Sequence, residues 1–275
     1  MRTILVVANE TLGGRPLLEA VRKHAQEEQT RFIVYVPRTK PRHGNIIYDD
    51  AVFQTAQVRI DLARSVMRAE GIDVIGEVGD PDPYTATMDA VGLYNPDAII
   101  ISTFPATSSG WLRRDLIERV SESVDVPVEH IVADIEAEGL PFGVTLVVAN
   151  RTTTSDPLFV ALREHAKGER HLFIVVVPQE GGEGLASRQA QARLNQLIDR
   201  MRAEGLLAGG MIGDPDPYHA TMNALNSFRV DDVLISTLPS TRSGWLRADL
   251  IERVRKASNK PVEHVVAQSP ASAAA

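Results

Sequence analysis

Short apolar runs alternate with helical stripes along this chain, and the pattern predicts a domain of parallel strands with covering helices. Five runs in the first half are mostly continuous and rich in β-branched residues, at residues 3–8, 31–36, 72–78, 97–103 and 128–133. Such runs are typical of strands that are buried on both faces. Stripes at helical spacing separate them, at Leu17, Val21 and Ala25, at Val58, Leu62 and Val66, at Met88 and Val91, and at Leu112, Leu116 and Val120. Because strands that alternate with helices pair in parallel, we expect a doubly wound α/β domain.

The chain carries this pattern twice. Four phrases return in the second half: "LVVAN" at 5–9 and 146–150, "RAEG" at 68–71 and 202–205, "GDPDPY" at 79–84 and 213–218, and "SGWLR" at 109–113 and 243–247. A repeat of about 130 residues has the size of a domain rather than of a solenoid unit. The sequence therefore indicates a tandem duplication, with a five-stranded parallel sheet and about four helices in each copy.

The duplication also predicts the domain boundaries. We expect domain 1 at residues 1–134, a linker at 135–143, domain 2 at 144–268 and a disordered tail at 269–275. The copies differ most after the second strand, where the first copy has a longer segment, residues 37–55, and the second copy is seven residues shorter. This segment either covers the crevice of its domain as a lid or has no role there. The two candidate pockets are therefore expected to be unequal.

Composition and charge exclude several classes of protein. Of the 275 residues, 44% are apolar, which is enough for two cores, and the formal net charge of -7 offers no attraction to nucleic acid or an anionic membrane. The absence of cysteine excludes disulfides, thiolate metal sites and cysteine nucleophiles, and it fits a reducing compartment. No apolar run has the length of a signal-peptide core or a membrane span. We expect a cytoplasmic protein whose partners include neither nucleic acid nor membrane.

The repeated "GDPDPY" has the composition of a turn that begins a helix. Gly79 can take a positive φ at the end of a strand, and Asp80 suits a turn. Asp82 followed by Pro83 is the sequence of a helix N-cap and first helical position. A metal site needs more than these two carboxylates, and no histidine cluster accompanies them. We therefore predict a capping turn, and no metal.

The exit of the fourth strand is richer in groups that could bind an anion. Hydroxyls, a glycine and an arginine precede or begin the helix expected near Trp111; they are Ser102, Thr103, Thr107, Ser109, Gly110 and Arg113, and in the second copy Ser236, Thr237, Thr241, Ser243, Gly244 and Arg247. A helix N-terminus binds phosphate and carboxylate groups, whereas arginine in a first turn opposes the helix dipole. Two interpretations of this arginine stay open, namely a bound anion or a local pair with Asp115 or Asp249. Ser109 is equally suited to be an N-cap.

Catalytic roles find little support in the sequence. Trp111 and Trp245 are expected to pack on a neighbouring strand. His130 and His264 lie within the last strands, as interior or interface histidines. A serine-histidine-aspartate grouping lacks the G-x-S-x-G elbow, and neither a P-loop nor G-x-G-x-x-G occurs. We assign no catalytic residue and expect a protein that is not an enzyme.

Three phrases resemble the universal stress protein family in its tandem two-domain form. They are the first strand "ILVVANE", the "GDP" that follows the third strand at a helix start, and the ending "ERVRKASNKPVEHVVA". The resemblance covers both copies and implies an adenine nucleotide alpha hydrolase-like fold. It also implies positions for ATP: family members that bind ATP use an aspartate after the first strand, a backbone contact from the second and a glycine motif after the fourth.

The chain departs from the ATP positions that the resemblance implies. The aspartate position holds Asn9 in the first copy and Asn150 in the second, and the second-strand contact falls on Val36 and Val177. Serine, proline and aspartate replace the glycine motif, and proline has no N–H to offer a phosphate. ATP stays a candidate ligand without an intact motif, and the hydroxyls and arginine of the fourth exit are an alternative anion cradle.

Two functions follow from these observations. We expect a non-catalytic, stress-associated regulator or scaffold; the alternative is a binder of ATP, AMP or another anionic small molecule through the loops after the first and fourth strands. The resemblance also implies that the last strand of each copy lies at a sheet edge, where unpaired backbone groups seek a partner. We therefore expect an internal pseudo-dimer of the two copies, and a homodimer of the chain as a further option.

Overall fold

The protein forms two compact units, Met1–Pro141 and Phe142–Ala275, each built on one sheet. The computed structural model describes residues 1–38, 49–106, 108–112, 115–180, 185–239, 243–247 and 249–267. The expected tail at 269–275 and most of the longer segment of the first copy, 39–48, lie outside these residues. Within the described ranges, no helix has the length and apolar character needed to cross a membrane.

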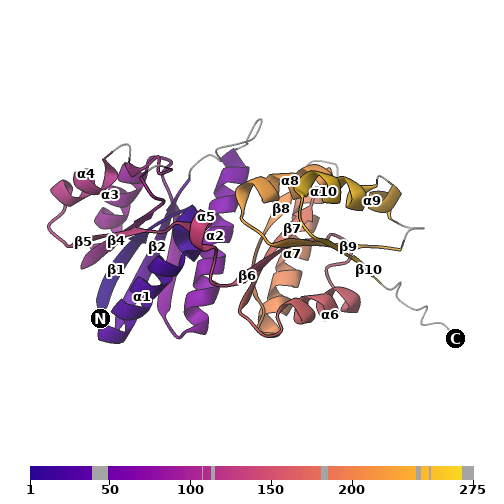
Figure 1. The fold of residues 1–275 in the computed structure, drawn as a ribbon, viewed down its shortest axis with the longest axis horizontal. Helices are drawn as coiled ribbons and strands as arrows, with labels where there is room; N and C mark the ends of the chain where they lie inside the picture. Colours follow the sequence, from indigo (N-terminus) through magenta and orange to yellow (C-terminus); the bar gives the residue numbers. More distant parts are fainter. Residues whose placement is uncertain are drawn as a thin grey trace. The chain divides into compact units, whose positions relative to one another are not determined.

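The sheet of the first unit has the strand order β3-β2-β1-β4-β5, with every pair parallel (Figure 1). Its strands are β1 (Arg2–Val7), β2 (Thr30–Pro37), β3 (Asp73–Gly79), β4 (Ala98–Thr103) and β5 (Val128–Val132). Each predicted apolar run forms one strand, which confirms the doubly wound α/β class. Because β1 lies in the centre, the strand order reverses between β1 and β4, and such a crevice is where open parallel sheets bind ligands.

Helices cover both faces of this sheet. They are the 3-10 helix η1 (Glu10–Gly13), α1 (Arg15–Glu27), α2 (Asp49–Ala69), α3 (Pro83–Tyr94), α4 (Leu116–Ser123) and α5 (Ile135–Glu138). The core under α3 and α4 joins Ala86 and Val120 to alternate residues of the central strands, such as Leu5 and Ile101, all of them buried. Helices α1 and α2 lie on the opposite face (Figure 1). Two covered faces explain why the strands are apolar along their whole length.

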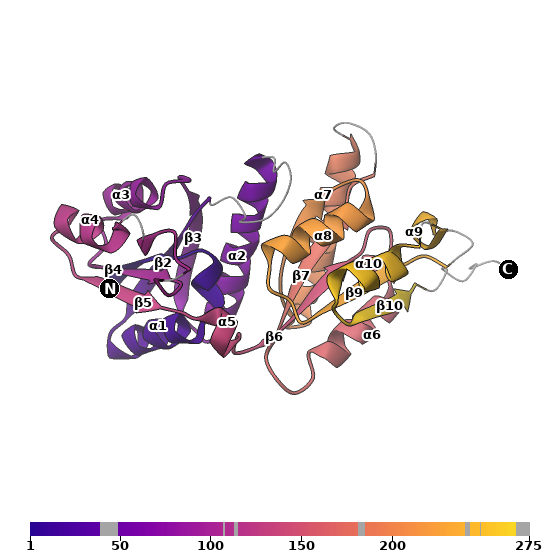
Figure 2. The same cartoon turned by 45° about the horizontal axis from the view of Figure 1, so that its top comes forward.

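The second unit repeats this architecture, and its sheet has the order β10-β9-β6-β7-β8 (Figure 2). Its strands are β6 (Gly143–Val148), β7 (His171–Pro178), β8 (Leu207–Gly213), β9 (Asp232–Thr237) and β10 (Val262–Val266). Its helices are α6 (Asp156–His165), α7 (Leu185–Ala203), α8 (Pro217–Ser227), α9 (Gly244–Arg247) and α10 (Leu250–Ser258). The order again reverses beside the first strand of the copy, between β6 and β9. The internal repeat in the sequence is therefore a repeat of the fold.

The two "GDPDPY" phrases form capping turns, as predicted. The carboxylate of Asp82 accepts a hydrogen bond from the backbone N–H of Thr85 at 3.0 Å, and Pro83 begins α3. Asp216 caps α8 in the same way, accepting from the N–H of His219 at 3.1 Å, and it also accepts from the N–H of Tyr218 at 2.7 Å. Both carboxylates therefore satisfy helix N-termini.

The expected positive φ at Gly79 is wrong. Positive φ occurs at other glycines and not at this one. A Cβ at Gly79 would lie 2.3 Å from Cε1 of Tyr35 and 3.0 Å from Cβ of Ala86, so α3 packs on the strand at a distance that leaves no room for a side chain. Glycine is needed here for close approach and not for backbone freedom.

The helix expected to begin near Trp111 is broken, which corrects the sequence prediction. Asp115 has a φ of 51° and Asp249 a φ of 50°, both in the left-handed region, and α4 and α10 begin one residue later. In the second unit the four-residue helix α9 precedes the break, and Arg247 is its last residue. The argument that this arginine opposes the dipole of the long helix therefore fails.

The segment expected as a linker contains a short capped helix. Ile135 begins α5, and the carboxylate of Asp134 caps it by accepting from the N–H of Ala137 at 3.1 Å. The side chain of Ile135 is buried, and Gly143 is already the first residue of β6.

Both last strands lie at sheet edges, as the resemblance implies. Strand β5 pairs only with β4 and β10 only with β9 within the described residues. Val132 and Val266 near the ends of these strands are 45% and 44% exposed. An edge strand with exposed valines is a surface that natural proteins usually cover or pair.

Candidate functional site

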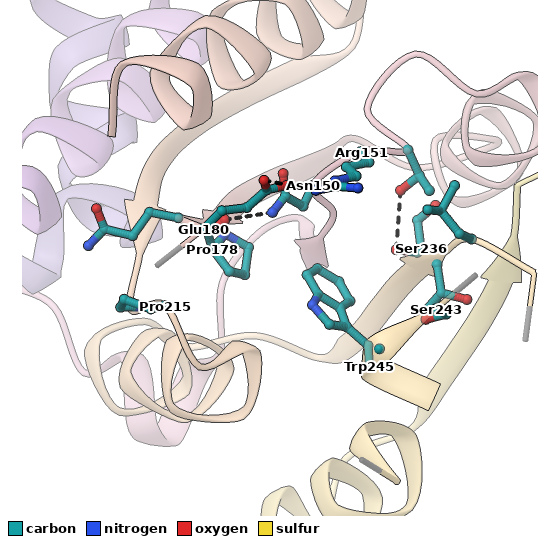
Figure 3. Close-up of a pocket in the computed structure, with 13 residues that line it drawn as sticks. Asn150, Arg151, Pro178, Glu180, Pro215, Ser236, Ser243 and Trp245 are labelled. Atoms are coloured by element: carbon teal, nitrogen blue, oxygen red, sulfur yellow. Dashed lines mark hydrogen bonds and ion pairs between the residues drawn. The ribbon is translucent and has the colours of Figure 1, made fainter. Parts of the chain in front are cut away.

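The second unit has a cavity at the carboxyl ends of its strands, where the strand order reverses. Its volume is about 390 Å³. The lining comes from the exits of β6, β7, β8 and β9 and from the start of α9, and it consists of Asn150, Arg151, Thr152, Pro178, Gln179, Glu180, Pro215, Ser236, Thr237, Leu238, Ser243, Gly244 and Trp245 (Figure 3). This is the position that the doubly wound topology favours for a ligand.

Asn150, the predicted counterpart of the aspartate of the ATP-binding family members, bridges two elements. Its Nδ2 donates to the carbonyl oxygen of Pro178 at 2.9 Å, and its Oδ1 accepts from Nη1 of Arg193 on α7. The amide is 8% exposed, so these bonds form in a sheltered place. Both polar atoms of the side chain are thus engaged by the protein itself.

The first unit has the same bridge at Asn9. Its Nδ2 donates to the carbonyl oxygen of Pro37 at 3.0 Å, and its Oδ1 accepts from Nη1 of Arg59 at 2.6 Å. Burial lowers the pKa of Arg59 to about 10, while the nearby charge of Glu10 acts in the opposite direction. An arginine from the second long helix of each copy therefore reaches the exit of the first strand.

Glu180 is the acidic group of the second-unit cavity and holds two guanidinium groups. It accepts from Nε and Nη2 of Arg151 at 2.7 and 3.0 Å, and from Nη1 of Arg193 at 3.0 Å. The hydrogen bonds from Arg151 are the main reason that the pKa of Glu180 falls to about 2, and the charge of Arg193 adds to the effect against partial burial. The carboxylate is therefore ionised at any physiological pH.

The exit of β9 contributes two hydroxyl side chains with different surroundings. Ser236 is 1% exposed, and its Oγ has no hydrogen-bond partner within the described residues; the same holds for Ser102. Thr237 Oγ1 lies 2.8 Å from Nε2 of His264, and Thr103 Oγ1 lies 2.9 Å from Nε2 of His130. Burial lowers the pKa of both histidines. Each ring is thus hydrogen-bonded within the fold, but the expected interior position is wrong for His130, which is exposed, and His264 is only partly buried.

Ser109 and Ser243 act as N-caps. Their Oγ atoms accept from the N–H groups of Leu112 and Leu246 at 3.2 and 3.3 Å. Gly110 and Gly244 follow them and are exposed. A capping serine stabilises the turn that carries the tryptophan and is not a free nucleophile.

The two tryptophans differ in their surroundings. Trp111 packs against the buried cluster of the first unit, as predicted. Trp245 lines the cavity of the second unit, and in Figure 3 its ring lies between Pro178 and the two serines. The fluorescence of Trp245 can therefore report on binding in this cavity.

Other predicted positions contribute less or lie outside the described residues. Val36 and Val177 are fully buried, and the lining of the cavity on β7 begins one residue later, at Pro178. Thr107, Arg113 and Thr241 fall outside the part of the chain that the structure describes, as does the side chain of Arg247. No group of three or more acidic or histidine side chains suited to a metal occurs in the described ranges.

The sequence analysis missed Arg59, Arg193, Arg151 and Glu180. A signal for two of them was present, because an arginine stands at the same place in both copies, in "QVRIDL" and "QARLNQL". On an otherwise mixed helix surface, a guanidinium kept in both copies indicates a fixed polar partner. The pairing with Glu180 had no such signal, since the first copy has a threonine at the corresponding position.

Comparisons with known proteins give similarity in solved structures only. No family model matches the chain, and no curated protein matches it. The crystal structure of a universal stress protein from Archaeoglobus fulgidus DSM 4304 is 17% identical and has a TM-score of 0.34, with 96% of each chain covered. A functionally unknown protein from Pseudomonas aeruginosa PAO1 is also 17% identical with a TM-score of 0.34, covering 97% of this chain and 93% of that one. Two parallel five-stranded sheets in tandem fit the tandem form of the universal stress protein family, which the sequence resembles.

Proposed function

We propose that this protein is a non-catalytic regulator that responds to a small molecule bound at the carboxyl end of its second sheet. The observation that carries the proposal is the cavity of about 390 Å³, lined from four strand exits and containing a buried serine hydroxyl without a partner in the described residues. A concave site at a topological switch point with a few convergent polar groups is the usual form of a ligand site in this fold.

The hydrogen bonds that the serine hydroxyl and the histidine make within the fold support a role without catalysis. Ser243 caps a helix turn, and His264 is bonded to Thr237 on the same sheet. A nucleophile needs a base within hydrogen-bond reach, and here the histidine and the capping serine serve different local structures. The stress association and the regulatory role rest on the resemblance of the sequence.

The ligand class that we propose is a small anion, with ATP and AMP as members to be tested first. The hydrogen bonds of Asn150 weigh against adenine recognition in the manner that the resemblance implies, because its amide is already bonded to Pro178 and Arg193. A base could bind there only by replacing these bonds. Two guanidinium groups, of Arg151 in the lining and of Arg193 beside it, meet one carboxylate, that of Glu180, and this excess of positive charge favours anions more generally.

Two measurements on the full chain test the proposal. Heat-released small molecules from the purified protein are identified by mass spectrometry, and ATP and AMP are added with and without magnesium while the melting temperature is followed. A ligand at a hundredfold excess over its Kd stabilises the folded state by about 2.7 kcal/mol and raises the melting temperature by several degrees. Absence of a stoichiometric small molecule together with an unmoved melting temperature would overturn ligand binding. Steady release of phosphate from ATP would overturn the non-catalytic role.

The two tryptophans provide a matched control for the place of binding. The chain has two tryptophans, and Trp245 lines the cavity while Trp111 lies in the other unit. We expect the added ligand to change the fluorescence of W111F, which retains Trp245, and to leave that of W245F unchanged. The reverse result would place the ligand outside the proposed cavity.

We also propose that the edges of β5 and β10 are assembly surfaces, as an internal pseudo-dimer of the two copies with a homodimer as a further option. The exposed Val132 and Val266 on strands that pair on one side only support this. The domains would be residues 1–134 and 144–268. Expression of each half tests the idea: each is expected to dimerise in analytical ultracentrifugation, and a half that stays a monomer at high concentration contradicts it.

A further inference from the structure

The two copies differ in charge directly after the bridging asparagine. Glu10 follows Asn9 in the first copy, and Arg151 follows Asn150 in the second. The buried arginine of the long helix is kept in both, as Arg59 and Arg193. In the first copy the carboxylate of Glu10 therefore lies near the guanidinium of Arg59. In the second copy the guanidinium groups of Arg151 and Arg193 lie near each other.

Glu180 balances the two guanidinium groups of the second copy. Its carboxylate takes both donors of the Arg151 fork, at 2.7 and 3.0 Å, and a third donor from Arg193 at 3.0 Å. Two arginines around one carboxylate are the arrangement by which proteins bind free carboxylates and phosphates. The low pKa of Glu180 shows that this surrounding favours negative charge.

The contact is accessible enough to be exchanged. The side chains of Arg151, Glu180 and Arg193 are 63%, 32% and 25% exposed. Arg151 is the most exposed of the three, so its bonds to Glu180 can be replaced by water or by another anion at lower cost than those of a buried pair. A ligand anion can therefore take the place of the Glu180 carboxylate without disrupting the core.

A second feature of the same cavity also points to a ligand. Ser236 lines the cavity, and its buried Oγ has no partner in the described part of the chain. Figure 3 shows Ser236 and Arg151 on the same cavity, with the ring of Trp245 between the serine side and Pro178. Ser236 and Arg151 thus line a space large enough for a small organic molecule, and Arg193 reaches its edge through Glu180.

We infer that Arg151 and Arg193 form an anion subsite in the second unit, that Glu180 is its internal occupant, and that a small molecule bearing a carboxylate or phosphate displaces it. The inference rests on the proposed function and names the group by which the ligand is recognised. In the described residues of the first unit Glu10 stands in place of Arg151, so this arginine pair does not form there. Because Glu180 must be displaced, only an anion that binds the two arginines more favourably than this carboxylate does occupies the subsite.

The inference is tested by titrating the full chain with sodium glutarate and, separately, with inorganic phosphate at constant ionic strength. E180Q removes the competing charge and is expected to bind at least one of these probes about tenfold more tightly than the unchanged protein, the size of effect that one charge-assisted contact produces. The probe that gains more identifies the anionic group. R151E gives the second copy the charge of Glu10 and is expected to weaken binding at least about tenfold.

Glu10 provides the matched control. E10Q alters the corresponding place in the first unit and is expected to leave the Kd of both probes unchanged within about twofold. The inference is overturned if E180Q binds both probes no more tightly than the unchanged protein, or if R151E binds them equally well. If the ligand found by heat release still changes Trp245 fluorescence with the same Kd in E180Q and R151E, the subsite fails and the proposed function stands. If nothing binds to any variant, both fail.

Discussion

Asn150 Nδ2 donates a hydrogen bond to the carbonyl oxygen of Pro178 at 2.9 Å, and this bond joins the exits of β6 and β7. The first unit repeats it between Asn9 and Pro37 at 3.0 Å. In both units an arginine of the following long helix donates to the oxygen of the same amide. The asparagine that stands where the resemblance implies a ligand-binding aspartate is thus part of the framework around these strand exits.

Removal of this amide is expected to destabilise the second unit. N150A leaves the carbonyl of Pro178 and a donor of Arg193 without their partner in a sheltered place, which costs about 1–3 kcal/mol. Urea denaturation followed by Trp245 fluorescence in a W111F background measures the free energy of unfolding of this unit. The control N226A changes an exposed asparagine on α8 and is expected to cost less than about 0.5 kcal/mol. Equal losses in the two variants would show that the bridge contributes nothing.

Glycines of the first unit are expected to respond in opposite directions to an added methyl group. G79A places a Cβ 2.3 Å from the ring of Tyr35, and such overpacking costs about 1–3 kcal/mol. G92A lies in α3 with no atom within 4 Å of its Cβ, and it gains up to about 1 kcal/mol of helix propensity. Thermal denaturation of both variants shows the sign. A neutral G79A would contradict the close approach of Tyr35 on β2 and Ala86 on α3 to this glycine.

The sequence was sufficient for the strands and for the two repeated caps, because these depend on neighbours along the chain, whereas η1, α5 and α9 were not predicted. The apolar runs, the repeat and the Asp82–Pro83 cap are all local signals, and each has the predicted structure. The helix break at Asp115 has no such signal. The spacing of Leu112, Leu116 and Val120 continues through it, so periodicity alone predicts one helix where the backbone takes a left-handed residue.

The candidate site depends on contacts between distant parts of the chain, which is why only part of it was predicted. The strand exits follow from topology, and of the residues predicted there Asn150, Ser236 and Ser243 line the cavity, while their binding of a ligand stays a prediction. Glu180 meets Arg151 across 29 residues and Arg193 across 13, through loops that have no common spacing rule. The sequence therefore predicted where the cavity lies, and the charged contacts of Arg151, Glu180 and Arg193 were found only in the structure.

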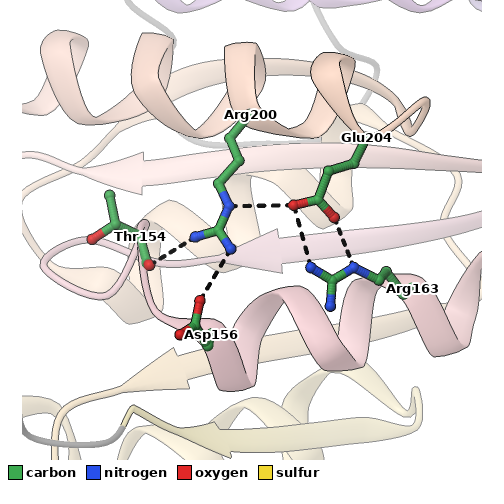
Figure 4. A network of polar contacts seen from close by, with 5 residues as sticks. All are labelled: Thr154, Asp156, Arg163, Arg200 and Glu204. Carbon is green, nitrogen blue, oxygen red and sulfur yellow. Dashed lines mark hydrogen bonds and ion pairs between the residues drawn. The ribbon is translucent and has the colours of Figure 1, made fainter.

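Arg200 is expected to stabilise the second unit through a network of polar contacts. It donates to Glu204, to Asp156 and to the carbonyl of Thr154, at 3.3, 3.1 and 2.9 Å (Figure 4). Its guanidinium also lies 3.7 Å from the ring centre of Phe159. We expect R200M to lower the free energy of unfolding by about 1 kcal/mol, less at high salt because the charges are then screened.

The control for this network is Arg202, which pairs with Asp199 while both side chains are 72% exposed. R202M is expected to change stability by less than about 0.5 kcal/mol. Urea denaturation at low and high salt separates the two variants. A salt-independent loss in R200M would assign its effect to packing on Phe159 and not to the ion pairs.

His264 is expected to make the second unit less stable in mild acid. Burial and the charge of Arg255 lower the pKa of His264 in the folded state, so the unfolded chain takes up the proton more readily. Stability from this group is therefore present above about pH 6.5, the ordinary histidine pKa, and is lost as the pH falls through that value toward the folded pKa. H264Q removes the titrating ring, and its melting temperature should fall less steeply than that of the unchanged protein between about pH 7 and about pH 5. H219Q, at an exposed histidine on α8, should keep the original slope. Identical slopes in H264Q and the unchanged protein would show that His264 does not contribute to the acid sensitivity.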